Sequence, residues 1–177
     1  MREIDFRNDL LPLKDKLFRL ALRITLDRPE AEDVVEDVLV KVWELRNTPE
    51  LQKVNNLELY CTTMARNLAL DRAERHEAHN VSLDDTDHEQ FAQQHADTAL
   101  QPDQQMERHD RHRWINELLQ QLPEKQRTIL QLRDIEEHSY QEVAEIMQIT
   151  DSDVKVTLFR ARQALKKLVL NSPNYGL

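Results

Sequence analysis

Apolar residues recur every three or four positions along most of the chain, which is the period of one face of an α-helix. Near the C-terminus this pattern predicts a short helix over 140–147 and a longer helix over 151–168. One stripe of the longer helix is apolar: Val154, Leu158, Ala161, Leu165 and Leu168. The other side is mostly basic: Lys155, Val156, Phe159, Arg160, Arg162, Lys166 and Lys167. The apolar stripe can pack while the basic side meets phosphates and base edges.

Local start and stop signals support both helices. Ser139 with Glu142 three residues later forms a capping box, and Thr150 is a good N-cap for the second helix. The turn between them usually has a glycine at positive φ, and Gln148 stands at that position. Placing glutamine rather than glycine in this conformation costs about 1 kcal/mol. The layout predicts a helix-turn-helix DNA reader; a surface helix with a solvated basic face is the plainer alternative.

The N-terminal part of the chain predicts three helices. The first carries Leu10, Leu13, Leu17, Ala21 and Ile24 on one side. The second begins near Pro29 and is expected to bury Ala31, Val34, Val35, Val38, Val42 and Trp43. The third runs from Leu57 to Arg75, after a polar loop over 46–56. Between the N-terminal part and the reader, one further helix stops before Pro123 and another follows it.

Composition and helical periodicity together predict an all-α chain, with two small helical domains joined by an acidic flexible linker. The single glycine, Gly176, excludes glycine-rich phosphate loops and argues against hairpin-rich β structure. Residues 76–110 carry nine acids and one basic residue, whereas 1–75 have a net charge of −2 and 111–177 of +1. We therefore expect domains over 1–75 and 111–170, a linker over 76–110 and a frayed tail over 171–177.

Several classes of function are disfavoured. The lone Cys61 forbids an internal disulfide and fits a reducing cytoplasm, and we expect neither a signal peptide nor a membrane-inserted segment. The spacing of His76 and His79 invites a metal hypothesis, but solvated histidines are the better explanation. No nucleophile–base pair is visible either, so the sequence predicts no enzyme, no cofactor and no metal.

Taken in order, the motifs resemble the extracytoplasmic-function (ECF) sigma factors of the sigma-70 family of bacterial RNA polymerase. The N-terminal motifs are Ala31-Glu32-Asp33-Val34-Val35-Glu36-Asp37-Val38, Lys41-Val42-Trp43 and the run from Tyr60 to Asp71. The C-terminal motifs are Leu122-Pro123-Glu124-Lys125-Gln126-Arg127, Tyr140 to Ile146 and Leu158-Phe159-Arg160-Ala161-Arg162. The resemblance covers both domains and leaves out the linker and the tail.

The resemblance implies a role for each domain. Domain 1–75 would bind core RNA polymerase at the clamp helices of its largest subunit, through Glu32, Asp33, Glu36, Asp37 and Lys41. It would also melt the minus-ten element and hold a flipped base near Asn67, through Tyr60, Thr63, Arg66, Asn67 and Asp71. Domain 111–170 would meet the flap and read the minus-thirty-five element of promoter DNA, through Lys155, Val156, Phe159, Arg160, Arg162 and Lys166. An anti-sigma factor is the other implied partner.

Departures from the family pattern leave the promoter sequence open. Thr157 stands where a basic residue is common, and Gln148 where glycine is common. Losing a cation at position 157 removes one phosphate contact and weakens binding to all sequences. Two other functions stay open at this point: a conventional helix-turn-helix regulator that binds duplex DNA without polymerase, and a helical adaptor that binds only protein.

Overall fold

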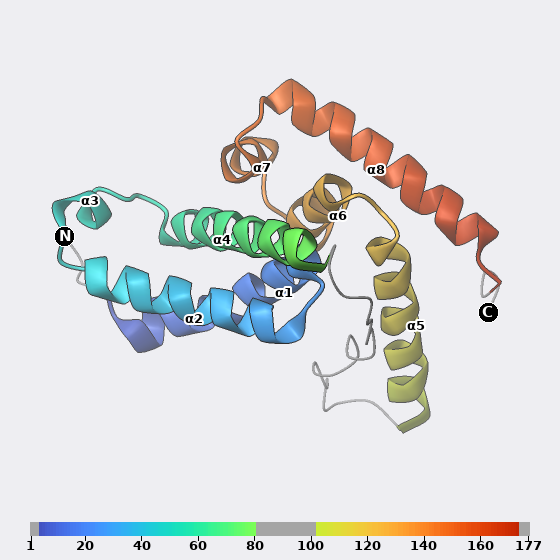
Figure 1. Ribbon diagram of the computed structural model, residues 1–177, viewed down its shortest axis with the longest axis horizontal. Coiled ribbons are helices and arrows are strands. Elements are labelled where there is room, and N and C mark those ends of the chain that lie inside the picture. Colours follow the sequence, from blue (N-terminus) through green and yellow to red (C-terminus); the bar gives the residue numbers. More distant parts are fainter. Residues whose placement is uncertain (1–3, 81–101, 174–177) are drawn as a thin grey trace.

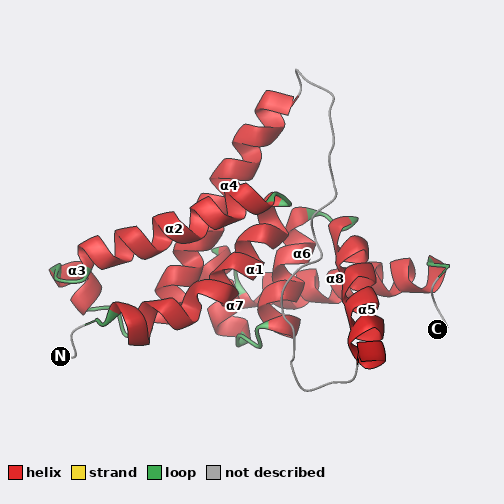
Figure 2. Cartoon of the chain, turned by 90° about the horizontal axis from the view of Figure 1, so that it is seen from below, coloured by secondary structure: helices red, strands yellow, loops and turns green. Residues whose placement is uncertain are grey.

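The computed structural model describes residues 4–80 and 102–173, with side chains described except at residues 80 and 102–109. All regular structure in these ranges is helical (Figures 1 and 2). The N-terminal domain comprises η1 (Phe6–Leu10), η2 (Leu11–Leu13), α1 (Lys14–Thr25), α2 (Arg28–Leu45), α3 (Pro49–Gln52) and α4 (Leu57–Asn80). The C-terminal domain comprises α5 (Pro102–Gln120), α6 (Glu124–Leu130), η3 (Gln131–Ile135), α7 (Tyr140–Met147) and α8 (Asp151–Asn171).

The core of the N-terminal domain lies where α1, α2 and α4 pack against one another. Each helix contributes one apolar stripe, represented by Leu17, Val38 and Ala65, all of them buried. α2 begins at a cap in which the Asp27 carboxylate accepts the Glu30 N–H at 2.9 Å. Capping satisfies an N–H that the helix itself leaves without a partner, so the start of α2 is fixed by its own sequence.

The C-terminal domain packs α6 and α7 against α8. Ile129, Ile146 and Leu158 are at most 2% exposed and form the centre of this contact. α5 lies against the far part of α8, where the Trp114 indole N–H donates to the Ser172 hydroxyl at 2.8 Å. In Figure 1, α8 follows α7 along one edge of the molecule, so its outer side meets no other described helix.

Three details differ from the sequence-based expectations. Trp43 is 37% exposed, because it lies with Glu36 and Val40 on the solvent side of α2, about 100° round from the buried Val42. The polar loop contains the single helical turn α3, which buries Leu51. The first predicted helix is divided, because Pro12 stands in the short turn η2 and α1 starts only after it.

The predicted linker, 76–110, is helical at both ends, because α4 continues to Asn80 and α5 begins at Pro102. Its central residues, 81–101, lie outside the described part of the chain. The two domains contact each other directly: α4 meets α7, and α1 meets both α6 and η3. Consequently the N-terminal half of α4 and the helix-turn-helix lie side by side (Figure 1).

Candidate nucleic-acid interface

The helix-turn-helix begins with the capping box that the sequence predicts. The Ser139 hydroxyl accepts the Glu142 N–H at 3.2 Å, and the Glu142 carboxylate accepts the Ser139 N–H at 2.8 Å. This bond from the Ser139 backbone holds the pKa of Glu142 below its ordinary value. The box fixes the first turn of α7 and therefore the direction in which the chain enters the reader.

The turn between α7 and α8 depends on Gln148, which has φ 55° and ψ 44° as the sequence predicts. The N–H of the next residue, Ile149, donates to the carbonyl of Ala144 at 3.0 Å and closes the end of α7. Thr150 then caps α8, and Asp153 returns the contact by accepting the Thr150 N–H at 3.3 Å. This second capping box was missed from the sequence, because Asp stands where Glu or Gln is the usual signal.

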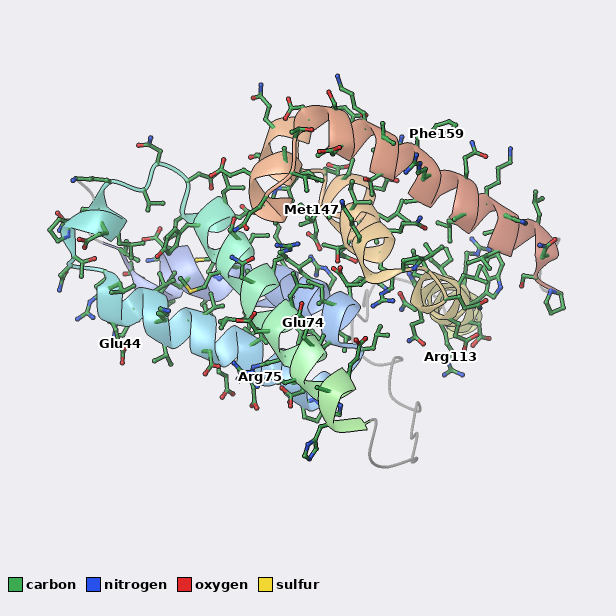
Figure 3. The ribbon with its side chains drawn as sticks, turned by 45° about the horizontal axis from the view of Figure 1, so that its top comes forward. Glu44, Glu74, Arg75, Arg113, Met147 and Phe159 are labelled. Carbon is green, nitrogen blue, oxygen red and sulfur yellow. The ribbon has the colours of Figure 1, made fainter. Side chains whose placement is uncertain are left out.

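The two sides of α8 separate as expected. Val154, Leu158 and Ala161 are buried, and Leu165 and Leu168 are partly buried against the same core. The predicted minus-thirty-five residues, which we call the reader face, are all exposed: Lys155, Val156, Phe159, Arg160, Arg162 and Lys166. Figure 3 shows Phe159 on the outer side of α8, pointing away from the other helices.

Phe159 is the most exposed large apolar side chain that the structure describes, at 64%. Val156, one turn before it, is 48% exposed. Exposed apolar groups of this size between cations are suited to contact with the methyl groups and edges of bases, which lysine and arginine alone do not provide. The chemistry of the reader face is therefore mixed, with cations for phosphates and two apolar side chains for bases.

Arg162 has an acidic neighbour within the protein. Its Nε and Nη2 groups donate to the two carboxylate oxygens of Asp134 at 3.0 and 2.5 Å. The hydrogen bonds to Asp134 raise the pKa of Arg162, so the guanidinium stays charged. Asp134 lies on η3, 28 positions before Arg162 in the sequence. No helical periodicity relates two residues so far apart, so the pair was not predicted from the sequence.

The predicted minus-ten residues lie along one side of α4, and we call them the melting face: Tyr60, Thr63, Arg66, Asn67 and Asp71. Asp71 is exposed and the other four are half-buried. Arg66 donates to the Asn67 side-chain oxygen at 3.2 Å, and the Thr63 hydroxyl donates to the carbonyl of Leu59 at 2.8 Å. The structure therefore gathers these side chains on one face and orients the Asn67 amide.

The predicted polymerase contacts lie on α2, and we call them the docking face: Glu32, Asp33, Glu36, Asp37 and Lys41. All five are exposed. Arg72 of α4 reaches across to this helix and donates to Glu30 at 2.8 Å, to Asp33 at 3.4 Å and to Asp37 at 2.7 Å. These contacts between Arg72 and α2 were not found from the sequence, because the partners lie 35 to 42 positions apart along the chain.

Two features that the described residues lack bear on other functions. Within residues 4–80 and 102–173, no cluster of three or more His, Cys, Asp or Glu side chains is arranged to hold a metal ion. In the same ranges, no helix combines the length and apolar character that crossing a membrane requires.

An all-helical chain with a capped helix-turn-helix and a basic outer face defines a DNA-binding protein, and comparison with known proteins gives the family. Residues 12–79 match the model of Sigma-70 region 2, and residues 112–165 match that of Sigma-70, region 4. The chain is 32% identical over 164 residues to the RNA polymerase sigma-H factor of Pseudomonas aeruginosa, covering 90% of this chain and 84% of that protein. It therefore belongs to the sigma-70 family of RNA polymerase sigma factors, in the ECF group.

Further similarities agree with this assignment. The ECF sigma factor SigW of Bacillus subtilis is 26% identical over 157 residues, covering 87% of this chain and 83% of that protein. Among solved structures, the sigma factor RpoE in complex with the anti-sigma factor NepR from Bartonella quintana has a TM-score of 0.70 at 22% identity, over 95% of this chain and 98% of that one. CnrH in complex with the cytosolic domain of CnrY has a TM-score of 0.61 at 18% identity, over 94% and 89% of the two chains. The fold is that of these sigma factors.

Proposed function

We propose that this ECF sigma factor divides promoter recognition between its three surfaces, each with one task. The docking face binds core RNA polymerase, the melting face opens the minus-ten element, and the reader face recognises the minus-thirty-five element. The observation that carries the proposal is the position of the reader face, whose six side chains are all exposed on a helix with a capped, rigid start. A conventional helix-turn-helix regulator would explain α7 and α8 but would leave the other two faces without a use.

For the reader face, the expected contacts follow from charge and exposure. Between Lys155 and Lys167, α8 carries cations and no acid, so it can approach a phosphate backbone without repulsion. Lys155 and Arg160 position the helix on the duplex, and Phe159 with Val156 contacts base edges. The whole chain has a net charge of −9, which keeps its binding to duplex DNA weak until polymerase adds contacts.

For the melting face, the proposal rests on amide chemistry beside an aromatic ring. The Asn67 amide can donate and accept at once, which matches the edge of a flipped base. Tyr60 lies two helical turns before it on the same side of α4, where a ring can stack on an unpaired base. Because Arg66 donates to Asn67 at 3.2 Å, the amide is oriented before DNA arrives.

For the docking face, the chemistry is that of an acidic helix. Its four carboxylates face solvent along one side of α2, and Arg72 holds Asp33 and Asp37 from the adjacent helix. A partner surface with cations at matching spacing would bind there, and we assign it to the clamp helices of the largest polymerase subunit. We further propose that the protein acts in the cytoplasm and is held inactive by an anti-sigma factor, as RpoE is bound by NepR.

The decisive experiment is transcription in vitro with bacterial core RNA polymerase and a library of promoter fragments. Start sites that depend on this protein would support the proposal, and the enriched upstream sequences would give both elements. Loss of those start sites in a variant with Arg160→Ala, with core binding unchanged, would tie the upstream element to the reader face. Tight binding to duplex DNA with no effect on core polymerase would instead identify a conventional regulator.

A further inference from the structure

One arginine of α4 bridges three acids of the neighbouring helix α2. Arg72 donates from Nη1 to Glu30 at 2.8 Å and to Asp33 Oδ2 at 3.4 Å. Its Nη2 group donates to Asp37 Oδ2 at 2.7 Å. The hydrogen bond to Glu30, and then that to Asp37, raises the pKa of Arg72, so the guanidinium stays charged. Two of the three acids that share this cation, Asp33 and Asp37, belong to the docking face.

The orientation of these two carboxylates depends on Arg72. Asp33 and Asp37 are four positions apart on α2, so they are neighbours on the helix surface and repel each other. Within the part of the chain that the structure describes, Arg72 is the only hydrogen-bond donor to either side chain. Without this donor, repulsion turns the two carboxylates apart and each samples several rotamers. Arg72 therefore fixes where both of them point.

The same contacts leave the outer side of each carboxylate available to a partner. Arg72 uses only the Oδ2 atom of each, and the Asp33 and Asp37 side chains remain 62% and 55% exposed. Arg72 itself is only 24% exposed, so it supports the pair from the side of α4. A carboxylate has about four lone-pair sites, and cations of a partner can bind the remaining ones without displacing Arg72.

We propose that Arg72 is a positioning residue of the docking face, which orients Asp33 and Asp37 for the cations of core RNA polymerase. This inference rests on the proposed function, because it takes the docking face to bind polymerase. Side chains that are already ordered in the free protein lose less conformational freedom on binding, so the oriented pair binds more tightly than a mobile pair would.

Positioning and simple charge predict opposite results when Arg72 is removed. Arg72→Gln makes the docking face more negative, and charge alone would then strengthen its attraction to a cationic partner. Loss of the fixed orientation weakens binding instead. Arg72→Lys separates the two explanations a second time, because lysine keeps the charge but lacks the planar fork that contacts two carboxylates at once.

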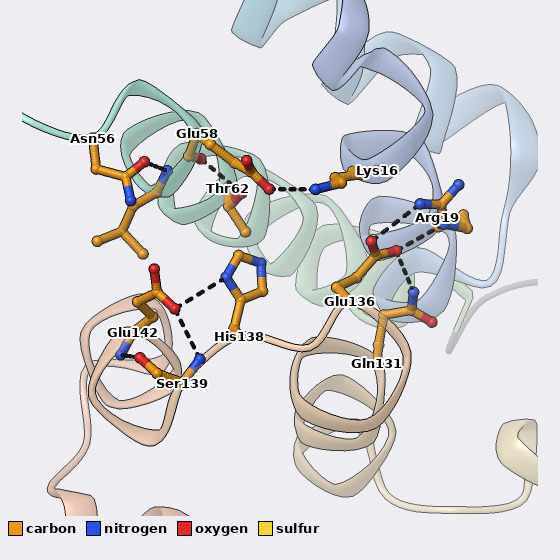
Figure 4. A network of polar contacts seen from close by, with 11 residues as sticks. Lys16, Arg19, Asn56, Glu58, Thr62, Gln131, Glu136, His138, Ser139 and Glu142 are labelled. Carbon is orange, nitrogen blue, oxygen red and sulfur yellow. Dashed lines mark hydrogen bonds and ion pairs between the residues drawn. The ribbon is translucent and has the colours of Figure 1, made fainter.

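The test measures association and dissociation rates with bacterial core RNA polymerase by surface plasmon resonance. Lys16→Gln is the matched control, because Lys16 of α1 pairs with Glu58 of α4 at 2.7 Å, outside the docking face (Figure 4). The control therefore also loses one cation and one ion pair between two helices of the N-terminal domain. Urea unfolding and the reactivity of the buried Cys61 thiol check that each variant is folded.

We expect both Arg72 variants to bind core polymerase about fivefold more weakly, mainly through faster dissociation. The Lys16 control should bind like the wild type. When Asp33→Asn and Asp37→Asn are already present, Arg72→Gln should have no further effect on affinity, because the groups through which it acts have lost their charge. A loss that persisted in this background would show that Arg72 acts on the fold and would overturn the proposal.

Nuclear magnetic resonance of the free protein gives a second readout that needs no polymerase. Three-bond couplings about χ1 report whether a side chain occupies one rotamer or several. We expect one rotamer each for Asp33 and Asp37 in the wild type and in the Lys16 control, and averaged couplings in both Arg72 variants. Averaged couplings in the wild type would show that Arg72 does not orient the pair.

Two binding results would also overturn the proposal. Tighter binding by Arg72→Gln would mean that Arg72 competes with the partner for the carboxylates. Wild-type affinity in Arg72→Lys would mean that only the charge of Arg72 matters. Failure of the wild-type protein to bind core polymerase at all would refute the proposed function instead, while the couplings would still decide whether Arg72 orients Asp33 and Asp37.

Discussion

Asp134 holds Arg162 by two hydrogen bonds that use one whole edge of the guanidinium, at 3.0 and 2.5 Å. Asp134 lies on η3 and Arg162 on the reader face of α8. A carboxylate from a neighbouring element therefore fixes the orientation of one cation of the reader face. Half of the Arg162 side chain remains exposed, at 50%. An incoming phosphate must therefore either use the remaining N–H groups or displace the carboxylate.

Asp134→Ala should strengthen duplex binding without improving selectivity. It removes a negative charge beside the DNA and frees the edge of Arg162 for a phosphate. We expect severalfold tighter binding to specific and random duplexes alike, and a salt dependence steeper by about one phosphate contact. Titrations at several salt concentrations measure both. Glu117→Ala on α5 removes an exposed acid outside the reader face and should leave both quantities unchanged. Weaker binding by the Asp134 variant would instead mean that the carboxylate positions Arg162.

Phe159→Ala should separate recognition from stability. Phe159 is 64% exposed, so its truncation should change the free energy of unfolding by no more than about 0.5 kcal/mol. The neighbouring Leu158 is 2% exposed, and Leu158→Ala should cost about 2–5 kcal/mol. Urea unfolding and transcription from a selected promoter test the pair. A large loss of stability in the Phe159 variant would place the ring in the core rather than on the reader face.

Asn67→Ala should impair strand opening more than assembly. Binding of polymerase to the closed promoter uses the reader and docking faces, whereas a captured base needs the Asn67 amide. Permanganate reactivity of unpaired thymines should fall at least tenfold while recruitment to the duplex is retained. Asn56→Ala is the control, because the Asn56 side chain lies outside the melting face and caps the start of α4, accepting the Leu59 N–H at 3.0 Å. Equal opening by wild type and the Asn67 variant would remove this residue from the melting face.

The thiol of Cys61 should be inert in the native protein. It is fully buried, and burial together with the nearby charge of Glu58 raises its pKa to about 12. At pH 8 the reactive thiolate is therefore almost absent. A thiol reagent should label the protein in denaturant within minutes and leave the native chain unlabelled for hours. Rapid native labelling would reveal local opening of the N-terminal domain.

Lowering the pH should weaken the N-terminal capping box of α7, because it protonates Glu142. Its folded pKa is lower than the ordinary value of 4.5, chiefly because it accepts the Ser139 N–H. A lowered folded pKa means a contribution that is present above pH 4.5 and is lost as the pH falls through the folded pKa. Thermal unfolding between pH 6 and 3 should therefore show a steeper loss of stability in the wild type than in Glu142→Gln. Parallel profiles would contradict the capping role.

Local signals carried the sequence-based prediction of the reader. The capping box at Ser139, the positive φ at Gln148 and the buried stripe through Leu158 are all confirmed, because each depends on residues a few positions apart. The all-α class is confirmed for the same reason, since glycine scarcity and helical periodicity act along the chain. The roles of the individual residues on the three faces stay predictions.

Contacts between distant segments could not be predicted in this way. Arg72 meets Asp37 across 35 positions and Arg19 meets Glu136 across 117, and no periodicity links such pairs. Trp43 was expected inside because it is large and apolar. Its place beside Val40 on the outer side of α2 leaves it 37% exposed, under the guanidinium of Arg46, which lies 4.0 Å from the centre of its ring.

The separation of 117 positions between Arg19 and Glu136 also has a consequence for synthesis on the ribosome. The helices of the N-terminal domain are complete at Asn80, 56 residues before Glu136. At about 5–20 residues per second, roughly 3–11 seconds pass before the partner of Arg19 has been translated. During that interval Arg19 cannot pair with Glu136, because that carboxylate has not yet been made, so the N-terminal helices have to pack without this ion pair.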